Sequence, residues 1–109
     1  MAKTKLTPDV LALVAQRFRA LAEPARLQIL QCMRRHEMTV TDLVGETGLG
    51  QANVSKHLQL LHAQGFVNRR KDGLFTYYAL ADQSVFALCD IMCSQLDSNA
   101  RARRRVLAS

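Results

Sequence analysis

The sequence lacks long apolar runs: no stretch approaches the roughly 18 consecutive apolar residues that a membrane-spanning helix requires. The first apolar stretch covers only residues 10–15, and Gln16 and Arg17 then interrupt it, which argues against a secretory signal peptide. We therefore expect no membrane contact and a cytoplasmic location.

Patterns for catalysis are missing as well. The chain has no glycine-rich phosphate loop, no nucleophile–base pair and no paired carboxylates at a spacing that suits acid–base chemistry. We therefore expect that it is not an enzyme. Its 109 residues suit a single domain, and its 3 cysteines, an odd number, argue against a disulfide framework.

Basic residues are in excess. The formal net charge is +6 and the isoelectric point is near 9.8, which favours a polyanionic partner such as nucleic acid. Many proteins are basic without binding nucleic acid, so the motifs must carry the prediction. Part of the excess lies near the C-terminus, at Arg101, Arg103, Arg104 and Arg105.

Residues 41–65 read as two helices joined by a tight turn. We expect Thr41 to cap the first helix and Gly48 to end it, because glycine readily adopts a left-handed conformation. The second helix is predicted over residues 51–64, with Val54, Leu58 and Leu61 on its inner face. A helix that is apolar on one side and polar on the other suits the major groove of DNA.

The polar side of this reading helix carries the predicted DNA contacts: Gln51, Asn53, Ser55, Lys56 and His57. Glutamine and asparagine pair bidentately with adenine, while Lys56 and Ser55 suit phosphate or guanine. His57 has a second interpretation, a neutral histidine fixed by a core or inter-helix hydrogen bond.

A hairpin is predicted directly after the reading helix, over residues 66–80. Asp72-Gly73 is a strong turn signal between two extended segments. The first segment carries Arg69, Arg70 and Lys71, which suit the DNA backbone or the minor groove. The alternative is an edge strand that its charges keep from aggregating.

The flanking segments complete the expected fold. Apolar periodicity predicts helices over residues 8–22, 25–35 and 84–98, and residues 39–40 suit a very short strand. The order indicates a mainly α protein with a β-hairpin wing, a winged helix-turn-helix with an extra helix at its N-terminus and another at its C-terminus. We expect this domain to span residues 1–98, followed by a basic tail over 99–109 that is a frayed helical extension or disordered.

The three cysteines are candidate sensing residues. Cys89 and Cys93 are four apart on one helix, so their Cβ atoms lie about 6 Å apart on one face. With Cys32 they would supply three sulfur ligands for a metalloid such as As(III) or Sb(III), or for another soft metal. Two alternatives remain, a redox-active thiol pair and small hydrophobic side chains of the core or a dimer interface.

Three strings resemble the ArsR/SmtB (arsenic-repressor) family of winged-helix repressors: RALAEPARLQIL (19–30), TVTDLVGETGLGQANVSKHLQLLHAQGFV (39–67) and RRKDGLFTYYAL (69–80). The resemblance implies a homodimer, built from the first and last helices, that represses transcription from a palindromic DNA operator until an inducer releases it. The chain departs from the pattern at Gly50, where the family usually has serine. The positions of the family's last-helix zinc site hold Asp82, Ser84, Gln95 and Ser98, so that site is largely absent.

The resemblance leaves the inducer open. Thiol-sensing members place a cysteine directly after the Ile-Leu pair of the second helix, where this chain has Gln31. A winged-helix regulator without cysteine-based sensing, or a protein-interaction winged helix, is the alternative function.

Overall fold

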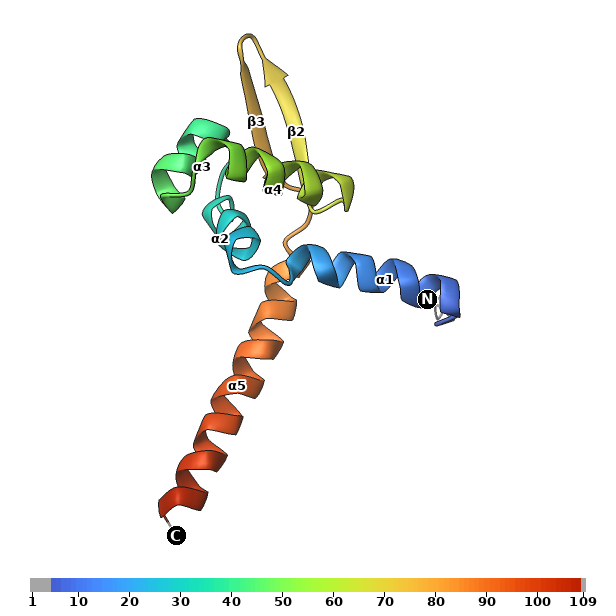
Figure 1. Ribbon diagram of the computed structural model, residues 1–109, viewed down its shortest axis with the longest axis vertical. Helices are drawn as coiled ribbons and strands as arrows, with labels where there is room; N and C mark the ends of the chain where they lie inside the picture. The colour runs from blue at the N-terminus through green and yellow to red at the C-terminus, as the bar shows by residue number, and fades with distance from the viewer. Residues whose placement is uncertain (1–4, 109) are drawn as a thin grey trace.

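The computed structural model describes residues 5–108, which form five helices and one small sheet (Figure 1). In chain order the elements are α1 (Pro8–Leu21), α2 (Pro24–Cys32), β1 (Met38–Thr39), α3 (Val40–Thr47), α4 (Gln51–Ala63), β2 (Val67–Asp72), β3 (Phe75–Leu80) and α5 (Ser84–Ala108). This order confirms the predicted winged helix-turn-helix with an additional helix at each end.

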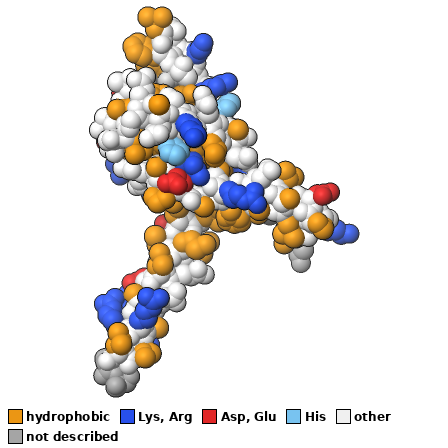
Figure 2. Space-filling model, viewed as in Figure 1, with side chains coloured by type: hydrophobic (Ala, Val, Ile, Leu, Met, Phe, Trp, Pro, Cys, Tyr) orange, Lys and Arg blue, Asp and Glu red, His pale blue; other side chains and the backbone are white. Residues whose placement is uncertain are grey.

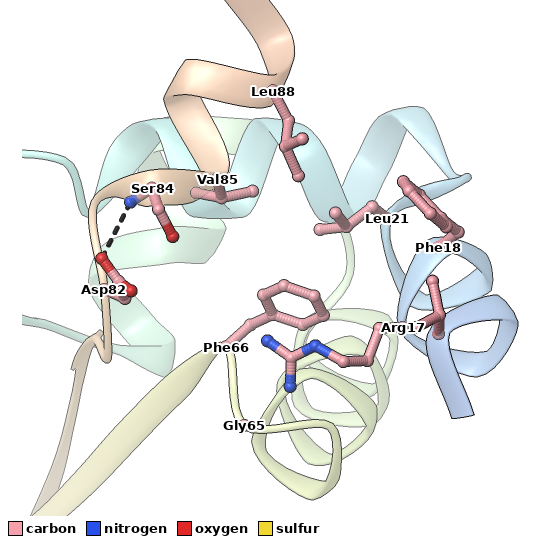
Figure 3. Close-up of a pocket in the computed structure, with 10 residues that line it drawn as sticks. Arg17, Phe18, Leu21, Gly65, Phe66, Asp82, Ser84, Val85 and Leu88 are labelled. Carbon is pink, nitrogen blue, oxygen red and sulfur yellow. Dashed lines mark hydrogen bonds between the residues drawn. The ribbon is translucent and has the colours of Figure 1, made fainter. Parts of the chain in front are cut away.

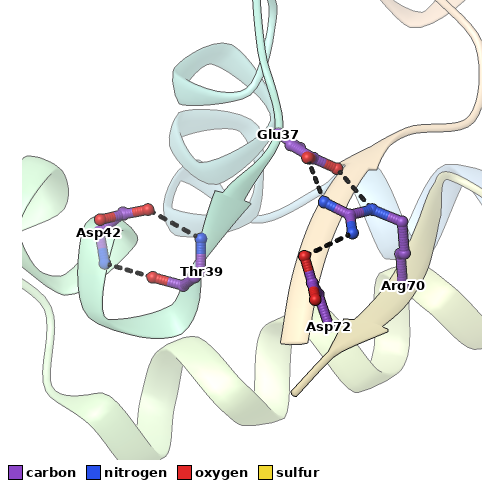
Figure 4. Close-up of polar contacts among 5 residues, drawn as sticks. All are labelled: Glu37, Thr39, Asp42, Arg70 and Asp72. Carbon is purple, nitrogen blue, oxygen red and sulfur yellow. Dashed lines mark hydrogen bonds and ion pairs between the residues drawn. The ribbon is translucent and has the colours of Figure 1, made fainter. Parts of the chain in front are cut away.

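Local sequence sets the helix ends. Thr39 caps α3: its side chain accepts from the amide of Asp42, and the Asp42 carboxylate accepts from the amide of Thr39 (Figure 4). The expected cap, Thr41, is therefore wrong, because the reciprocal capping box needs an acid three residues after the cap. Gly48 ends α3 as predicted, with a left-handed φ of 73°.

The core lies where α2, α3 and α4 meet the base of the hairpin. Its completely buried side chains are Ile29, Leu30, Leu43, Val54, Leu58, Leu61 and Val67. The inner face predicted for α4 is thus confirmed, and its burial turns the polar side of α4 outward.

The sheet is antiparallel with the strand order β1-β3-β2. Val67 pairs with Leu80 at the base of the hairpin, and Asp72 pairs with Phe75 at its tip, where Gly73 takes a φ of 61°. β1 is centred one residue earlier than expected, since Val40 already begins α3. The hairpin, residues 67–80, is called the wing below.

α1 and α5 project from this body as two arms (Figure 1). Of the α5 side chains whose burial is described, only those of Val85 and Phe86 are buried, and every one from Asp90 onward is exposed. The helix continues ten residues beyond the expected end at residue 98. An ion pair stabilises this extension: Nη2 of Arg101 lies 3.1 Å from Oδ2 of Asp97, four residues earlier on the same helix.

α2 ends at Cys32, three residues before the predicted end. Leu27 on this helix is 36% exposed because it lies beside the arms rather than in the core. Within residues 5–108, no helix has the combination of length and apolarity that a bilayer crossing demands.

Candidate nucleic-acid interface

The polar side of α4 faces solvent. Gln51, Asn53 and Lys56 are exposed, while Ser55 and His57 are half-buried at its two edges. The first turn of α4 contains no acidic residue, so the positive end of its helix dipole is not neutralised there. Gly50 occupies the cap position without a side-chain hydrogen bond. The surface therefore presents hydrogen-bond donors and positive potential.

His57 is also tied to the neighbouring helix α2. Its Nδ1 lies 3.3 Å from Nη1 of Arg26. The inter-helix hydrogen bond considered for this histidine is thus present. It engages one ring nitrogen and leaves the other for a second partner.

The wing divides its three basic residues between two faces. Arg70 lies opposite Tyr77, with its guanidinium 4.8 Å from the ring centroid, and pairs with Glu37 and Asp72 (Figure 4). Its positive charge is therefore largely compensated by these two carboxylates. This pairing was not evident from the sequence, because Glu37 lies 33 residues away.

Arg69 and Lys71 project from the other face of the wing. Strand alternation places both on the side of the buried Val67 and Tyr78, which pack against the helices at the base of the wing. Neither side chain forms an ion pair with any of residues 5–108. They are exposed and available for a polyanion.

Arg17 fastens α1 to the end of α4. Its Nη1 donates to the backbone oxygen of Gln64, and its guanidinium stacks 4.4 Å from the centroid of Phe66. Figure 3 shows both side chains at one wall of a cavity of about 190 Å³, with Asp82, just before α5, and Val85, in the first turn of α5, across from them. The cavity is small and mainly apolar, and it marks the junction of the two arms with the body.

The arms expose an apolar stripe, called the arm surface below. Its members are Leu11 (49% exposed), Val14 (37%), Phe18 (52%), Leu88 (43%), Met92 (58%) and Leu96 (68%). Figure 2 shows hydrophobic side chains gathered along α5 and around its junction with α1. The arm surface borders an apolar groove of about 410 Å³, which Cys89 and Cys93 also line. Exposing so large an apolar stripe to water does not stabilise a monomer, so the stripe indicates a contact with another protein chain.

The three cysteines do not meet within one chain. Cys89 and Cys93 line the same groove, whereas Cys32 does not line it and packs against the core. Among residues 5–108, no three metal-ligating side chains are close enough to hold an ion. The three-sulfur site, one of the alternatives considered from the sequence, is therefore not formed within a single chain. Burial, followed by the charge of Glu46, raises the pKa of Cys32 above its usual value, so its thiol stays protonated at neutral pH.

A helix with an outward polar side, a short helix packed before it and a basic hairpin after it define a DNA-binding regulator of the winged helix-turn-helix class. Residues 23–69 match the model of the bacterial regulatory proteins of the arsR family. The chain belongs to this family, whose members regulate transcription and are not enzymes.

Curated relatives support this assignment over most of the chain. A probable mercury resistance operon repressor from Streptomyces lividans is 39% identical over 88 residues, covering 81% of this chain and 70% of the relative. A transcriptional repressor SmtB homolog from Synechocystis is 35% identical over 89 residues, covering 77% of this chain and 67% of the relative.

The fold is also that of a solved structure, the homodimeric winged helix-turn-helix DNA-binding domain of a Mycobacterium bovis protein. That domain matches with a TM-score of 0.74 at 30% identity, over 94% of this chain and 95% of its own. At this sequence identity the two chains are similar in sequence as well as in fold.

Two arginines with structural roles were not identified from the sequence as functional residues. Arg26 appeared only within a family-like string, and Arg17 only as the end of an apolar stretch. Both bind partners on other helices, 31 and 47 residues away, which no local pattern reports.

Proposed function

We propose that the protein represses transcription as a homodimer on a palindromic DNA operator, with each α4 in a major groove. One observation carries this proposal: the polar side of α4 stands beside a wing whose Arg69 and Lys71 have no ion pair within the described chain. A regulator of bacterial DNA works in the cytoplasm, so we also propose that location.

The arm surface is the proposed dimer interface. Its six side chains are between 37% and 68% exposed, and a second copy of the same stripe would cover them. A twofold dimer presents two reading helices, and their half-sites are then about 34 Å apart, one turn of DNA. The homodimeric Mycobacterium bovis domain supports this assembly.

The DNA contacts follow from exposure. Gln51 and Asn53 are the proposed base-reading side chains, and Lys56 and Ser55 bind phosphate or guanine. In the wing, Arg69 and Lys71 contact the backbone. Arg70, also expected at the DNA, contributes less because Glu37 and Asp72 already neutralise it.

The basic end of α5 is proposed to attract DNA at long range rather than to contact it. We keep residues 1–98 as the winged domain and 99–109 as its basic extension. In Figure 1 the wing and α4 lie at one end of the molecule and the C-terminal end of α5 at the other. Its arginines are thus far from the surface that reads bases.

The proposed inducer acts through Cys89 and Cys93. Both line the apolar groove at the arm surface, so a metalloid or soft metal bound there, or oxidation of the thiols, would alter the interface that spaces the two reading helices. Cys32 is the weaker candidate, since burial raises the pKa of its thiol. The name of the Streptomyces relative connects that protein with mercury resistance, which supports a soft ligand here.

Salt-dependent DNA binding tests the repressor proposal. Gel retardation of the promoter of its own gene should weaken steeply with salt, because each phosphate contact releases counterions. Lys56→Ala should lower the slope of log affinity against log salt by about one per half-site. Arg69→Ala should do the same, whereas the matched variant Arg70→Ala should change the slope less. Failure to retard that promoter and a random-sequence pool, even at low salt, would refute the proposal.

Mass spectrometry tests the inducer. Native spectra after arsenite, and separately after a polysulfide, should show an adduct or an oxidised pair at Cys89 and Cys93. The double variant Cys89→Ser, Cys93→Ser should keep DNA binding and lose release by the active reagent, while Cys32→Ser should respond as wild type does. Release of the double variant at wild-type reagent concentrations would rule out these thiols as the sensor.

A further inference from the structure

The guanidinium of Arg26, on α2, forms hydrogen bonds to three groups on two other helices. Its Nε donates to the backbone oxygen of Ala20 at 2.6 Å, and its Nη2 donates to that of Arg19 at 3.1 Å. Both oxygens belong to the last turn of α1, where carbonyls lack the usual helical partner, and that of Arg19 also accepts from the Ala22 amide at 3.2 Å. Its Nη1 lies 3.3 Å from Nδ1 of His57 on α4. One half-buried guanidinium therefore joins the end of α1 to the reading helix.

The chemistry of this pair determines the state of His57. A guanidinium remains charged and carries only donors, so Nη1 of Arg26 donates and Nδ1 of His57 accepts. An imidazole whose Nδ1 accepts is neutral and carries its proton on Nε2. Protonation of Nδ1 would remove the lone pair and break the hydrogen bond.

His57 stands at the edge of the proposed DNA-binding surface. It follows Lys56 and lies one helical turn after Asn53, both of which are exposed. The two ring nitrogens of an imidazole point in widely different directions, so a ring held at Nδ1 directs its Nε2–H away from Arg26. The matching acceptors on DNA are a phosphate oxygen and the N7 and O6 atoms of guanine.

We infer that Arg26 is a positioning residue for DNA binding, which holds His57 as the Nε2–H tautomer so that this nitrogen donates to an acceptor on the DNA. The inference rests on the proposed function, since it assigns His57 to the DNA interface. It also explains why one arginine serves two helices: anchoring to the carbonyl end of α1 fixes the guanidinium that orients the histidine.

The free protein tests the tautomer without DNA. Long-range ¹H–¹⁵N spectra of histidine-labelled protein should show a protonated Nε2 and an unprotonated Nδ1 for His57, with the signal assigned by its absence in His57→Gln. Arg26→Lys keeps the charge but loses the planar fork, so the two ¹⁵N shifts should move toward a tautomeric average. The matched control Arg104→Lys, on α5, should leave them unchanged. A wild-type His57 protonated at Nδ1, or a spectrum that Arg26→Lys does not alter, overturns the inference.

A double-mutant cycle tests the link to DNA. His57→Ala and Arg26→Lys should each weaken operator binding about tenfold per half-site, the effect of losing one hydrogen bond to a charged group. Together they should bind no more weakly than His57→Ala alone, because Arg26 acts through His57. If the affinity losses of the two single variants instead multiply in the double variant, Arg26 has a merely structural role and the inference is overturned. Absence of DNA binding by wild type would instead refute the proposed function, while the spectra still decide the Arg26–His57 pairing. If Arg26→Lys does not fold, the wild-type spectrum alone decides the tautomer.

Discussion

Replacing Leu96 by alanine should separate the proposed dimer while leaving the fold of each chain intact. Leu96 is 68% exposed in the single chain, so it contributes little to the monomer's own core. The substitution removes three carbon atoms, each worth about 0.8 kcal/mol when fully buried. If the partner covers the exposed part, the loss is about 1.6 kcal/mol per side chain.

Twofold symmetry doubles this loss. Each dimer contains two copies of Leu96, so the total is about 3.3 kcal/mol, which corresponds to a dimer Kd about 200-fold higher. Sedimentation equilibrium over a concentration series measures that constant, and far-UV circular dichroism reports whether helix content is retained. DNA affinity should fall in parallel, because a monomer reads only one half-site.

Leu74→Ala is the matched control. Leu74 is 100% exposed at the tip of the wing, far from the arm surface, and the same three carbons are removed. Its dimer Kd should equal that of wild type. The reasoning would be refuted if Leu96→Ala also dimerised within about threefold of wild type, since a covered leucine cannot lose that much surface without effect.

Three further predictions concern stability, measured by urea unfolding at fixed protein concentration. Leu58→Ala should lower the unfolding free energy by about 2–5 kcal/mol, because Leu58 is 0% exposed at the centre of the core. Thr39→Ala should cost about 1 kcal/mol, since it breaks the capping box of α3, whereas Thr41→Ala should change little. The pKa of Asp82 is lowered by the hydrogen bond that the Ser84 amide donates to its carboxylate. Asp82 therefore stabilises the fold fully above about pH 4, the usual pKa of an aspartate in the unfolded chain. This contribution disappears as the pH falls through the lower pKa of the folded state. Asp82→Ala should accordingly differ from wild type at pH 7 and converge with it in acid.

Features that depend on neighbouring residues were predicted well. The inner face of α4, the left-handed stop at Gly48 and the turn at Gly73 all follow from side-chain periodicity or backbone freedom within a few residues. The prediction for the cap of α3 was wrong although capping is a local feature, because two threonines lie close enough to the start of the helix to cap it. Only one of them has an acid three residues ahead.

The candidate site was predictable as a surface but not as a set of contacts. Periodicity placed Gln51, Asn53 and Lys56 on the outer side of α4 because the inner side had to be apolar. It did not distinguish Arg70 from Arg69, since their difference depends on Glu37 from a distant segment.

Three properties can be read from the amino-acid sequence alone: the order of helices and strands, the basic character of the chain and the polar side of the reading helix. These properties come from apolar periodicity, turn residues and charge, which act over a few residues. The tertiary structure, in contrast, sets which long side chains meet. It neutralised Arg70, separated Cys32 from Cys89 and Cys93, and joined Arg26 to His57. Such contacts depend on how helices pack around a common core, and packing brings together residues that no sequence spacing relates.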